Sequence, residues 1–344
     1  MEKFIEKCYL NLVNGWKRHI LLISLFLTTV TGFSQDPRKI WDYAPHQAFT
    51  DLVYFKGKFY CTFREGTGHV PGPNGTDGVI RILSSEDGNS WFPESLLASD
   101  RYDLRDPKIS VTPDGRLMLV IGGSHYEKGK LLSQLTHVSF SDYDGKCFSQ
   151  PIPTELDPAI ENEFNWLWRV TWHEGVAYGV VYQGRKGLAY LVSSVNGVHY
   201  KLVCELDIEG SPNEASIEFD DEGEMHMIVR RGGGSRLGYF GVAKFPYKKW
   251  NWTELDQQLG GPHLTILPNG KIIIVSRYYR SSGATTAIFE LQKNHLKVLE
   301  ILPSGGDTSY PGLVLQDDKL TISYYSNHEQ KTSIYLAVRE WEKF

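Results

Sequence analysis

The chain has 344 residues, of which 41% are hydrophobic and 22% are charged, and its formal net charge is −5. This is the composition of an ordinary globular protein, and the absence of a basic stripe argues against a nucleic-acid-binding function. The length is sufficient for one large core, and an aromatic content of 13% suits β-strands and surfaces that stack on sugars.

The first 35 residues differ from the rest of the chain. Lys17 and Arg18 precede an apolar run from Ile20 to about Phe33, and small polar residues follow it. This order is typical of a cleaved signal peptide. A retained membrane anchor is the alternative, but the apolar run is short for a segment that spans a bilayer. We therefore expect a secreted or periplasmic protein whose mature chain, residues 36–344, is one domain without stable membrane insertion.

The cysteines do not suggest a disulfide framework. Cys8 would leave with the signal peptide, and Cys61, Cys147 and Cys204 remain, each inside an expected strand or at its edge. An odd number argues against systematic pairing, and no Cys/His spacing resembles a zinc site. We expect buried, inert thiols, with neither a metal nor a cofactor.

One pattern recurs along the mature chain: an alternating apolar run, a tight turn and a second apolar run, as in "DLVYFKGKFYCTFRE". Such a turn between two β-rich runs is a strong hairpin signal. The turns are centred on Gly57, Gly115, Gly175, Gly223, Gly270 and Asp318. Successive turns are 47 to 60 residues apart. A repeat of this length that carries several strands predicts a β-propeller.

A second pattern lies between the hairpins in the segments 84–91, 141–148 and 193–200. Each segment reads Ser, three residues, Gly, two residues and an aromatic, with Asp or Asn directly before the Gly. We interpret each as a turn between outer strands, built by the Asx side chain and the glycine, with the aromatic packed beneath it.

These patterns predict an all-β protein, a six-bladed β-propeller of four-stranded antiparallel blades. The sixth hairpin is followed by only one clear strand, so we expect residues 38–46 to supply the fourth strand and close the ring. Residues 154–164 could form a short turn of helix.

In a propeller, function collects at one end of the central channel, on the loops that enter it. At the starts of the first strands we find Asp51, Arg105, Asp106, Arg169, Asn213, Glu214, His263, Asp307 and Tyr310. At the ends of the second strands we find Arg64, Glu65, His125, Tyr182, Arg230, Arg231, Arg277, Tyr324 and Tyr325. The arginine fork suits a ligand with a carboxylate or a sulfate, although charges at strand ends are also often solvated or paired across blades.

From these two sets we predict a group of substrate-binding side chains. They are Arg64, Arg105, Asp106, Arg230, Arg231, Arg277, His263 and Tyr324.

The mature chain resembles the sialidase superfamily over essentially its whole length. The three Ser-to-aromatic turns are similar to the Asp boxes of that superfamily, in which an acid stands two residues before the Gly. Here Glu86, Tyr143 and Val195 occupy that place, so the boxes are degenerate.

The resemblance also implies a set of catalytic groups. The segment "DTSYPGLVLQDDKL" is similar to the one that carries the nucleophilic tyrosine, which implies that role for Tyr310. The segment "NEASIEFDDEGEMHMIVRR" implies that Glu214 is the base and that Arg230 or Arg231 binds a carboxylate. Asp77, in the loop after the first hairpin, matches the acid/base best. A phenol needs a nearby carboxylate to take its proton, so this set is chemically coherent.

One departure from the resemblance concerns the substrate. Sialidases open the first blade with Arg-Ile-Pro, but Ala48 stands here where that arginine would be. The candidates to compensate for it are Arg64 and Arg105, and the candidates for a third arginine are Arg277 and Arg280. An ordinary sialoside is therefore one candidate beside another ulosonic acid, a uronate or a sulfated sugar.

The resemblance implies a secreted, retaining exo-glycoside hydrolase that acts on a terminal acidic sugar of a glycan. A propeller that binds glycans without cleaving them is the first alternative, and a structural propeller with a protein partner is the second. Glycan binding without sugar release would support the first alternative, and the lack of thermal stabilisation by any acidic monosaccharide would support the second.

Overall fold

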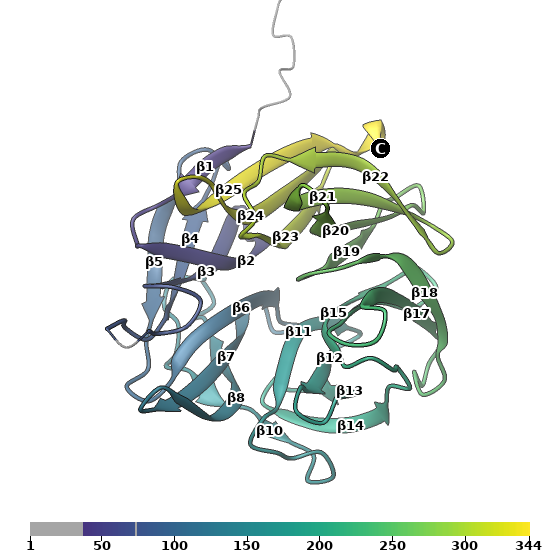
Figure 1. Ribbon diagram of the computed structural model, residues 1–344, viewed down its shortest axis with the longest axis horizontal. Coiled ribbons are helices and arrows are strands. Elements are labelled where there is room, and N and C mark those ends of the chain that lie inside the picture. Colours follow the sequence, from purple (N-terminus) through teal and green to yellow (C-terminus); the bar gives the residue numbers. More distant parts are fainter. Residues whose placement is uncertain (1–36, 73) are drawn as a thin grey trace, which may run out of the picture. The chain divides into compact units, whose positions relative to one another are not determined.

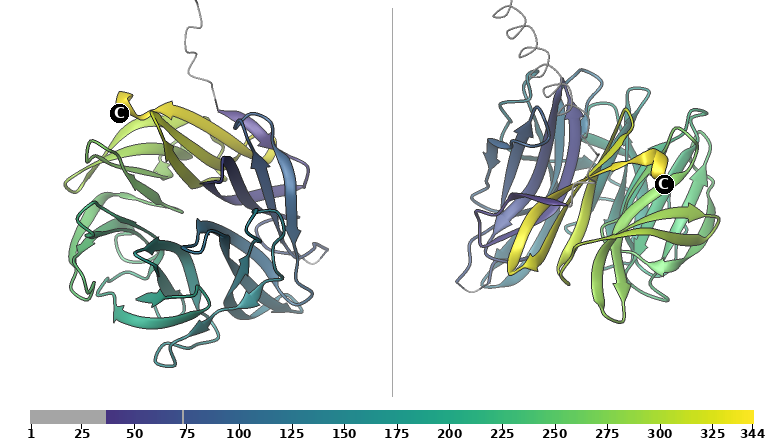
Figure 2. Two further views of the ribbon diagram at one scale, coloured as in Figure 1. Left: turned by 180° about the vertical axis from the view of Figure 1, so that it is seen from behind. Right: turned by 90° about the horizontal axis from the view of Figure 1, so that it is seen from above.

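The computed structural model describes residues 37–72 and 74–344, so the predicted signal peptide lies outside the described residues. The described chain forms six antiparallel four-stranded blades in a ring, one of which gains a short fifth strand (Figure 1). Figure 2 shows the same ring from behind and from above. The prediction of a six-bladed β-propeller is confirmed. Within the described residues, no helix has the length and apolar character needed to cross a membrane.

The blades follow one another along the chain, with the innermost strand first. Blade 1 contains β2 (His46–Phe55), β3 (Lys58–Gly66), β4 (Val79–Ser85) and β5 (Phe92–Leu97). Blade 2 contains β6 (Asp103–Val111), β7 (Leu117–Glu127), β8 (Lys130–Phe140) and β9 (Ile152–Pro153). Blade 3 contains β11 (Trp166–His173), β12 (Val176–Gln183), β13 (Leu188–Ser194), β14 (His199–Glu205) and the short β10 (Glu155–Leu156).

The second half of the ring repeats this order. Blade 4 contains β15 (Pro212–Phe219), β16 (Met225–Arg231), β17 (Leu237–Ala243) and β18 (Asn251–Gln258). Blade 5 contains β19 (His263–Ile266), β20 (Ile272–Arg280), β21 (Gly283–Gln292) and β22 (His295–Leu302). Blade 6 contains β23 (Thr308–Gln316), β24 (Lys319–Glu329), β25 (Lys331–Glu340) and β1 (Arg38–Trp41). A short 3-10 helix, η1 (Trp341–Lys343), follows β25.

The ring is closed by the N-terminal strand, as predicted. Strand β1 pairs antiparallel with β25, which places residues from both ends of the described chain in blade 6. No helix forms at residues 154–164, where a short turn of helix was expected. Glu155–Leu156 form β10, which pairs with β14, and the N–H of Ile160 donates to the carbonyl oxygen of Asp157 in a single turn.

The turns follow the sequence patterns closely. All six predicted hairpins join the first two strands of a blade, and Gly115 is typical of them, with a φ of 79° that favours glycine. The three Ser-to-aromatic segments join third and fourth strands. In the first of these, Asp87 accepts hydrogen bonds from the backbone N–H groups of Asn89 and Ser90 at 2.7 and 2.8 Å. In the third segment, Oδ1 of Asn196 accepts hydrogen bonds from the backbone N–H groups of Val198 and His199, as expected of an Asx turn.

The core lies between neighbouring blades and contains mainly aliphatic side chains. All three described cysteines are free, which agrees with the expected lack of disulfides. Cys61 is buried and Cys204 is half-buried, but Cys147 is exposed, so the expectation of buried thiols is wrong for this residue. Cys147 lies in the turn before β9, where its strand neighbours do not cover it.

The innermost strands bulge at the end where the site lies. In five of the six first strands the pairing register shifts within the first half of the strand, for example between Arg105 and Lys108 and between Ser309 and Gly312. Phe49, Asp106 and Tyr310 stand at these bulges with φ angles of 64°, 49° and 52°. A bulge changes the direction of the side chain that it carries, and such bulges are common beside active sites.

Candidate active site

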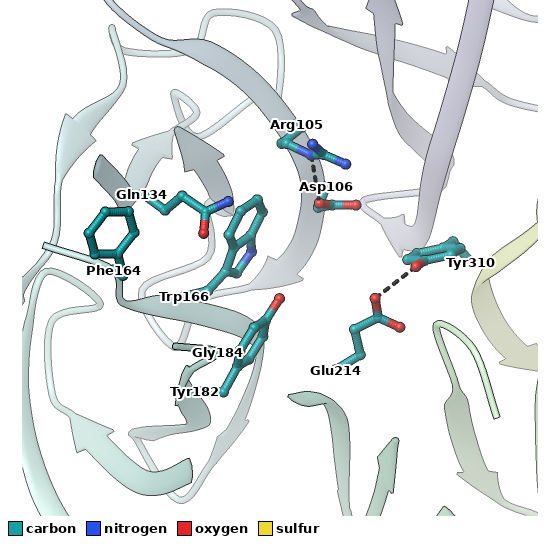
Figure 3. A pocket seen from close by; sticks show the side chains of 9 residues that line it. All are labelled: Arg105, Asp106, Gln134, Phe164, Trp166, Tyr182, Gly184, Glu214 and Tyr310. Carbon is teal, nitrogen blue, oxygen red and sulfur yellow. Dashed lines mark hydrogen bonds and ion pairs between the residues drawn. The ribbon is translucent and has the colours of Figure 1, made fainter. Parts of the chain in front are cut away.

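A cavity of about 210 Å³ opens beside these bulges (Figure 3). Its lining comes from blades 2, 3, 4 and 6. The lining residues are Arg105, Asp106, Gln134, Phe164, Trp166, Tyr182, Gly184, Glu214 and Tyr310. Four of the predicted site residues, Arg105, Asp106, Glu214 and Tyr310, therefore meet in one pocket.

Tyr310 is the buried phenol of this pocket. Its backbone and that of Ser309 are left-handed, with φ angles of 52° and 92°, directly before Pro311. This strained bulge aims the ring across the channel, where the Tyr310 hydroxyl donates a hydrogen bond of 2.7 Å to Oε1 of Glu214 (Figure 3). Burial and the charge of Glu214 raise the pKa of Tyr310 well above its usual range, so the phenol is neutral in the resting protein.

Glu214 lies near the start of β15 and is held at both carboxylate oxygens. Oε1 also accepts a hydrogen bond of 2.5 Å from Nη1 of Arg230 on β16, and Oε2 accepts one of 2.7 Å from the backbone N–H of Gly261. A Cβ on Gly261 would lie 2.6 Å from Cγ of Tyr310, so only glycine fits there while the ring keeps its place. The carboxylate is thus fixed in the orientation needed to receive the phenol proton.

Aromatic rings and cations surround the ring of Tyr310. Phe49 and Trp168 make edge contacts with it, at centroid distances of 5.0 and 5.7 Å. The guanidinium of Arg277 lies 5.4 Å from the Tyr310 centroid, and Nζ of Lys108 lies 5.9 Å from it. Because these cations sit in a buried environment, they stabilise negative charge that develops on the phenol oxygen more strongly than they would in water.

Asp106 is a second buried carboxylate that faces the pocket (Figure 3). Its Oδ2 accepts a hydrogen bond of 3.2 Å from Nε of Arg105, while Oδ1 is buried without a hydrogen-bond partner. Burial raises the pKa of Asp106 despite the opposing charges of Arg105 and Lys108. An unpaired acceptor of this kind suits a sugar hydroxyl, because hydroxyls donate to carboxylates.

The outer wall of the pocket is aromatic. The rings of Trp166 and Tyr182 are stacked, with an interplanar angle of 10° and a centroid distance of 6.3 Å, and Phe164 and Gln134 complete the wall. Tyr182 belongs to the strand-end set identified from sequence, but Gln134, Phe164 and Trp166 were missed. Trp166 stands at the start of an innermost strand, and this position could have identified it from the sequence. Gln134 lies on the third strand of blade 2, and no sequence pattern marks it as a site residue.

Asp77, the predicted acid/base, is exposed on the loop between β3 and β4 and does not line the cavity. Partial burial and the neighbouring charge of Asp103 raise its pKa, and the charge of Arg64 opposes this. The backbone N–H of Gly78, the next residue, donates to Asp103 at 2.6 Å, which fixes the chain beside Asp77. The raised pKa suits a proton donor, and the exposed loop position leaves the side chain accessible.

Arg64 is fully buried and paired with Asp103 at 2.6 Å, and it also donates to the carbonyl oxygen of Gly68. Its guanidinium therefore supports the loop that carries Asp77 and presents no free face to a ligand. Ala48, which pairs with Arg64 across the blade, is buried as well. Of the two arginines considered as replacements at Ala48, only Arg105 lines the pocket.

Two further predicted residues lie away from the cavity. Arg231 is buried against the outer strands of blade 4, where it donates to Glu254 and Ser235, whereas Arg230, its neighbour on the strand, donates to Glu214. Tyr324 is in the core of blades 5 and 6, where its hydroxyl donates to a backbone carbonyl. Successive residues of a strand face opposite sides, so Tyr325 points the other way, and its ring centroid lies 6.0 Å from that of Tyr310.

His263, a predicted binding residue, does not line the pocket, and its Nδ1 lies 3.3 Å from the carbonyl oxygen of Pro311. Burial and the charges of Arg169 and Lys108 lower its pKa well below the usual range, which keeps the imidazole neutral. Arg169 itself is paired with the buried Asp51 at 2.7 Å. Arg169 and His263 thus both contact the carbonyl oxygen of Pro311, the residue after Tyr310, and neither lines the cavity.

The comparisons with known proteins agree with this geometry at the level of the fold. Neither a protein-family profile nor a curated protein matches the sequence. Among solved structures, a protein of unknown function from Dyadobacter fermentans superposes with a TM-score of 0.73 at 19% identity, over 89% of this chain and 99% of that one. The NanB sialidase of Streptococcus pneumoniae gives 0.68 at 10% identity, over 91% of this chain and 72% of that one. The chain has the six-bladed propeller fold of the sialidases.

The same propeller also occurs with another activity. The α-L-arabinofuranosidase Arb93A of Fusarium graminearum superposes with a TM-score of 0.66 at 15% identity, over 90% of this chain and 98% of that one. The fold is thus shared with glycoside hydrolases that act on different sugars, and the choice of sugar has to be argued from the pocket.

Proposed function

We propose that this chain is a retaining exo-glycoside hydrolase with Tyr310 as its nucleophile and Glu214 as the base that activates it. The observation that carries the proposal is the hydrogen bond of 2.7 Å from the Tyr310 hydroxyl to Glu214 at the edge of a cavity. A buried phenol that donates to a carboxylate beside a cavity has the arrangement of an activated nucleophile.

In the first step the phenol oxygen attacks the anomeric carbon while its proton passes to Oε1 of Glu214. The bond between the anomeric carbon and the leaving oxygen breaks, and Asp77 supplies the proton that this oxygen needs. In the second step Asp77 takes a proton from water, the water oxygen attacks the anomeric carbon, and Glu214 returns its proton to Tyr310. Two displacements at one carbon retain the anomeric configuration.

Asp106 competes with Asp77 for the acid/base role. It lines the pocket and has a raised pKa, whereas Asp77 is more accessible to a leaving group that points to solvent. We assign Asp77 to proton transfer, because Asp106 is already paired with Arg105, and we assign Asp106 to a hydroxyl of the bound sugar.

We propose a terminal acidic sugar as the substrate. Arg105 lines the cavity, Arg230 donates to the carboxylate of Glu214 that also binds Tyr310, and the guanidinium of Arg277 lies 5.4 Å from the centroid of the Tyr310 ring. A sugar carboxylate or sulfate beside the anomeric centre can pair with these cations, and the stacked rings of Trp166 and Tyr182 offer an apolar wall for a sugar face. We further propose that residues 1–35 direct secretion and are then removed.

A glycan-binding protein without turnover is the second candidate, and the position of Asp77 outside the cavity lining favours it. Both functions predict sugar binding, so only release of the aglycone separates them.

The test uses 4-methylumbelliferyl glycosides of sialic acid, a ulosonic acid, uronic acids and a sulfated hexosamine, with an α-L-arabinofuranoside as a neutral comparison. We expect fluorescence release from one acidic glycoside, the initial product with retained configuration by NMR, and a fluorinated analogue trapped on Tyr310 by mass spectrometry. Binding of an acidic sugar without any release would replace the proposal with the second candidate. A trapped sugar on another residue would overturn the role of Tyr310.

A further inference from the structure

A second cluster of polar side chains lies beside Tyr310, outside the cavity lining. It consists of His46 on β2, His69 on the loop between β3 and β4, and Asp307 directly before β23. Nε2 of His69 is 2.9 Å from both carboxylate oxygens of Asp307, and Nε2 of His46 is 3.3 Å from Oδ2. The two imidazole rings are 4.7 Å apart.

The donor atoms of this cluster lie close to one another. One ligand atom from each residue can be chosen so that all three lie within 4.8 Å of one another. Two ligands bonded to one tetrahedral Zn²⁺ at roughly 2.1 Å are about 3.4 Å apart, so the observed separations need only small side-chain rotations to accept the ion. Two imidazole nitrogens and one carboxylate are a ligand set that transition metals prefer and that Ca²⁺ and Mg²⁺ do not.

The carboxylate of the cluster is held by outer contacts. The hydroxyl of Tyr325 donates to Oδ1 of Asp307 at 2.8 Å, and Nη2 of Arg277 donates to the Tyr325 hydroxyl at 2.9 Å. Such outer hydrogen bonds orient the first ligands of a metal site. The side chains of His46, Asp307 and His69 are 12%, 26% and 43% exposed, so the cluster is anchored on one side and open to solvent on the other.

We propose that His46, His69 and Asp307 bind a divalent transition-metal ion, with Zn²⁺ as the best match, and that the ion ties the β3–β4 loop to the strand that carries Tyr310. The connection is short: the ring of Phe49 lies 5.1 Å from that of His69 and 5.0 Å from that of Tyr310. The same loop carries Asp77. The ligands are up to 261 positions apart in sequence, so their spacing could not have predicted the site, and the expectation of no metal rested on local spacing alone.

The first experiment measures metal binding and does not depend on the proposed glycosidase function. Untagged mature protein is stripped with EDTA, dialysed, and titrated with ZnCl₂ by calorimetry, and Co²⁺ is used as an absorbing probe of the coordination geometry. We expect one saturable site and a tetrahedral or five-coordinate Co²⁺ spectrum. In His69→Ala and Asp307→Asn the affinity should fall by at least about tenfold.

Two control variants test whether the bound Zn²⁺ occupies this cluster and not another histidine. His295, an exposed histidine, is paired with Asp256 alone, so His295→Ala should leave Zn²⁺ binding unchanged. Asp220, Glu224 and His226 form another group of potential ligands, and His226→Ala tests it. The proposal is overturned if no saturable binding occurs, or if binding is lost in His226→Ala and kept in His69→Ala.

Hydrogen exchange tests whether the bound ion holds the loop between β3 and β4 in place. We expect Zn²⁺ to slow amide exchange in peptides that contain His69 in the wild type and not in His69→Ala. Saturable binding without this protection would overturn the role of the ion in holding the loop. Protection together with an inactive enzyme would leave this inference standing and count against the proposed glycosidase instead.

Discussion

Oε1 of Glu214 accepts hydrogen bonds from both the hydroxyl of Tyr310 and the guanidinium of Arg230, at 2.7 and 2.5 Å. The charge of Glu214 raises the pKa of Arg230, so the resting site holds a tightly paired carboxylate. In the mechanism proposed above, the carboxyl of Glu214 loses its charge when it receives the phenol proton, and its attraction for Arg230 weakens. Arg230 would then be free to pair with an anionic sugar while Tyr310 is bonded to the anomeric carbon, so that activation of the proposed nucleophile and recognition of substrate charge would be linked.

Tyr310→Phe removes the oxygen proposed as the nucleophile, together with one hydrogen bond to the Glu214 carboxylate, which keeps two other donors. We expect kcat on the glycoside that the fluorogenic panel identifies to fall by at least about a thousandfold, because Tyr310 is the lining phenol that donates to the proposed base, Glu214. The unfolding free energy should fall by about 1–3 kcal/mol at most, since the ring packing remains. Steady-state kinetics and urea unfolding measure the two effects. A variant that keeps a tenth of the wild-type kcat would rule out the tyrosine mechanism.

Asp77→Asn and Asp106→Asn distinguish the two carboxyl groups. If Asp77 is the acid, Asp77→Asn should slow substrates with poor leaving groups by roughly a hundredfold or more and spare an activated aryl glycoside in the first step. Its raised pKa also predicts that the alkaline limb of kcat/KM lies above the usual Asp range and disappears in this variant. Asp106→Asn should mainly raise KM. The reverse pattern would transfer the acid role to Asp106.

The close contact between Gly261 and the ring of Tyr310 predicts that a larger residue at position 261 will displace the ring. In Gly261→Ala the new Cβ would lie 2.6 Å from the Tyr310 ring, so the ring must move and its bond to Glu214 must lengthen. We expect a fall in kcat of about a hundredfold from a displacement of about an ångström. Gly115→Ala is the matched control: its φ of 79° is also left-handed, but a Cβ there meets open space. Similar losses of activity in the two variants would show that backbone strain alone is responsible.

Sequence patterns predicted the blades well because hairpins are local: a turn glycine and the alternating runs on either side of it lie within about fifteen residues. The pairing of Tyr310 with Glu214 spans 96 residues, and it was expected from family resemblance and not from spacing. Neither spacing nor resemblance identified Lys108 as a residue near the site. Lysines are usually exposed, so its burial could not be predicted from its type. Such residues become visible only when the blades bring distant segments together.

Lys108 is a buried amine whose Nζ lies 5.9 Å from the centroid of the Tyr310 ring, and its burial predicts a pH dependence of stability. Its Nζ donates to the carbonyl oxygen of Thr50 at 2.8 Å, and burial followed by the charge of Arg169 lowers its pKa from 10.5 to about 8. Between these two values the unfolded chain binds more protons than the folded one, so this group makes the folded protein more stable as the pH rises from about 8 to 10.5 and has no further effect below 8.

Lys108→Met isolates this contribution from the tyrosines that also titrate at high pH. The unfolding free energy of the wild type, minus that of Lys108→Met, should rise by about 3 kcal/mol between pH 8 and 10.5 and stay flat from pH 6 to 7.5. Urea unfolding at half-unit pH steps measures the difference. A flat difference over the whole range would mean that the amine is solvated and keeps its ordinary pKa. It would then be a surface-like charge, and the buried cation under Tyr310 would lose its electrostatic role.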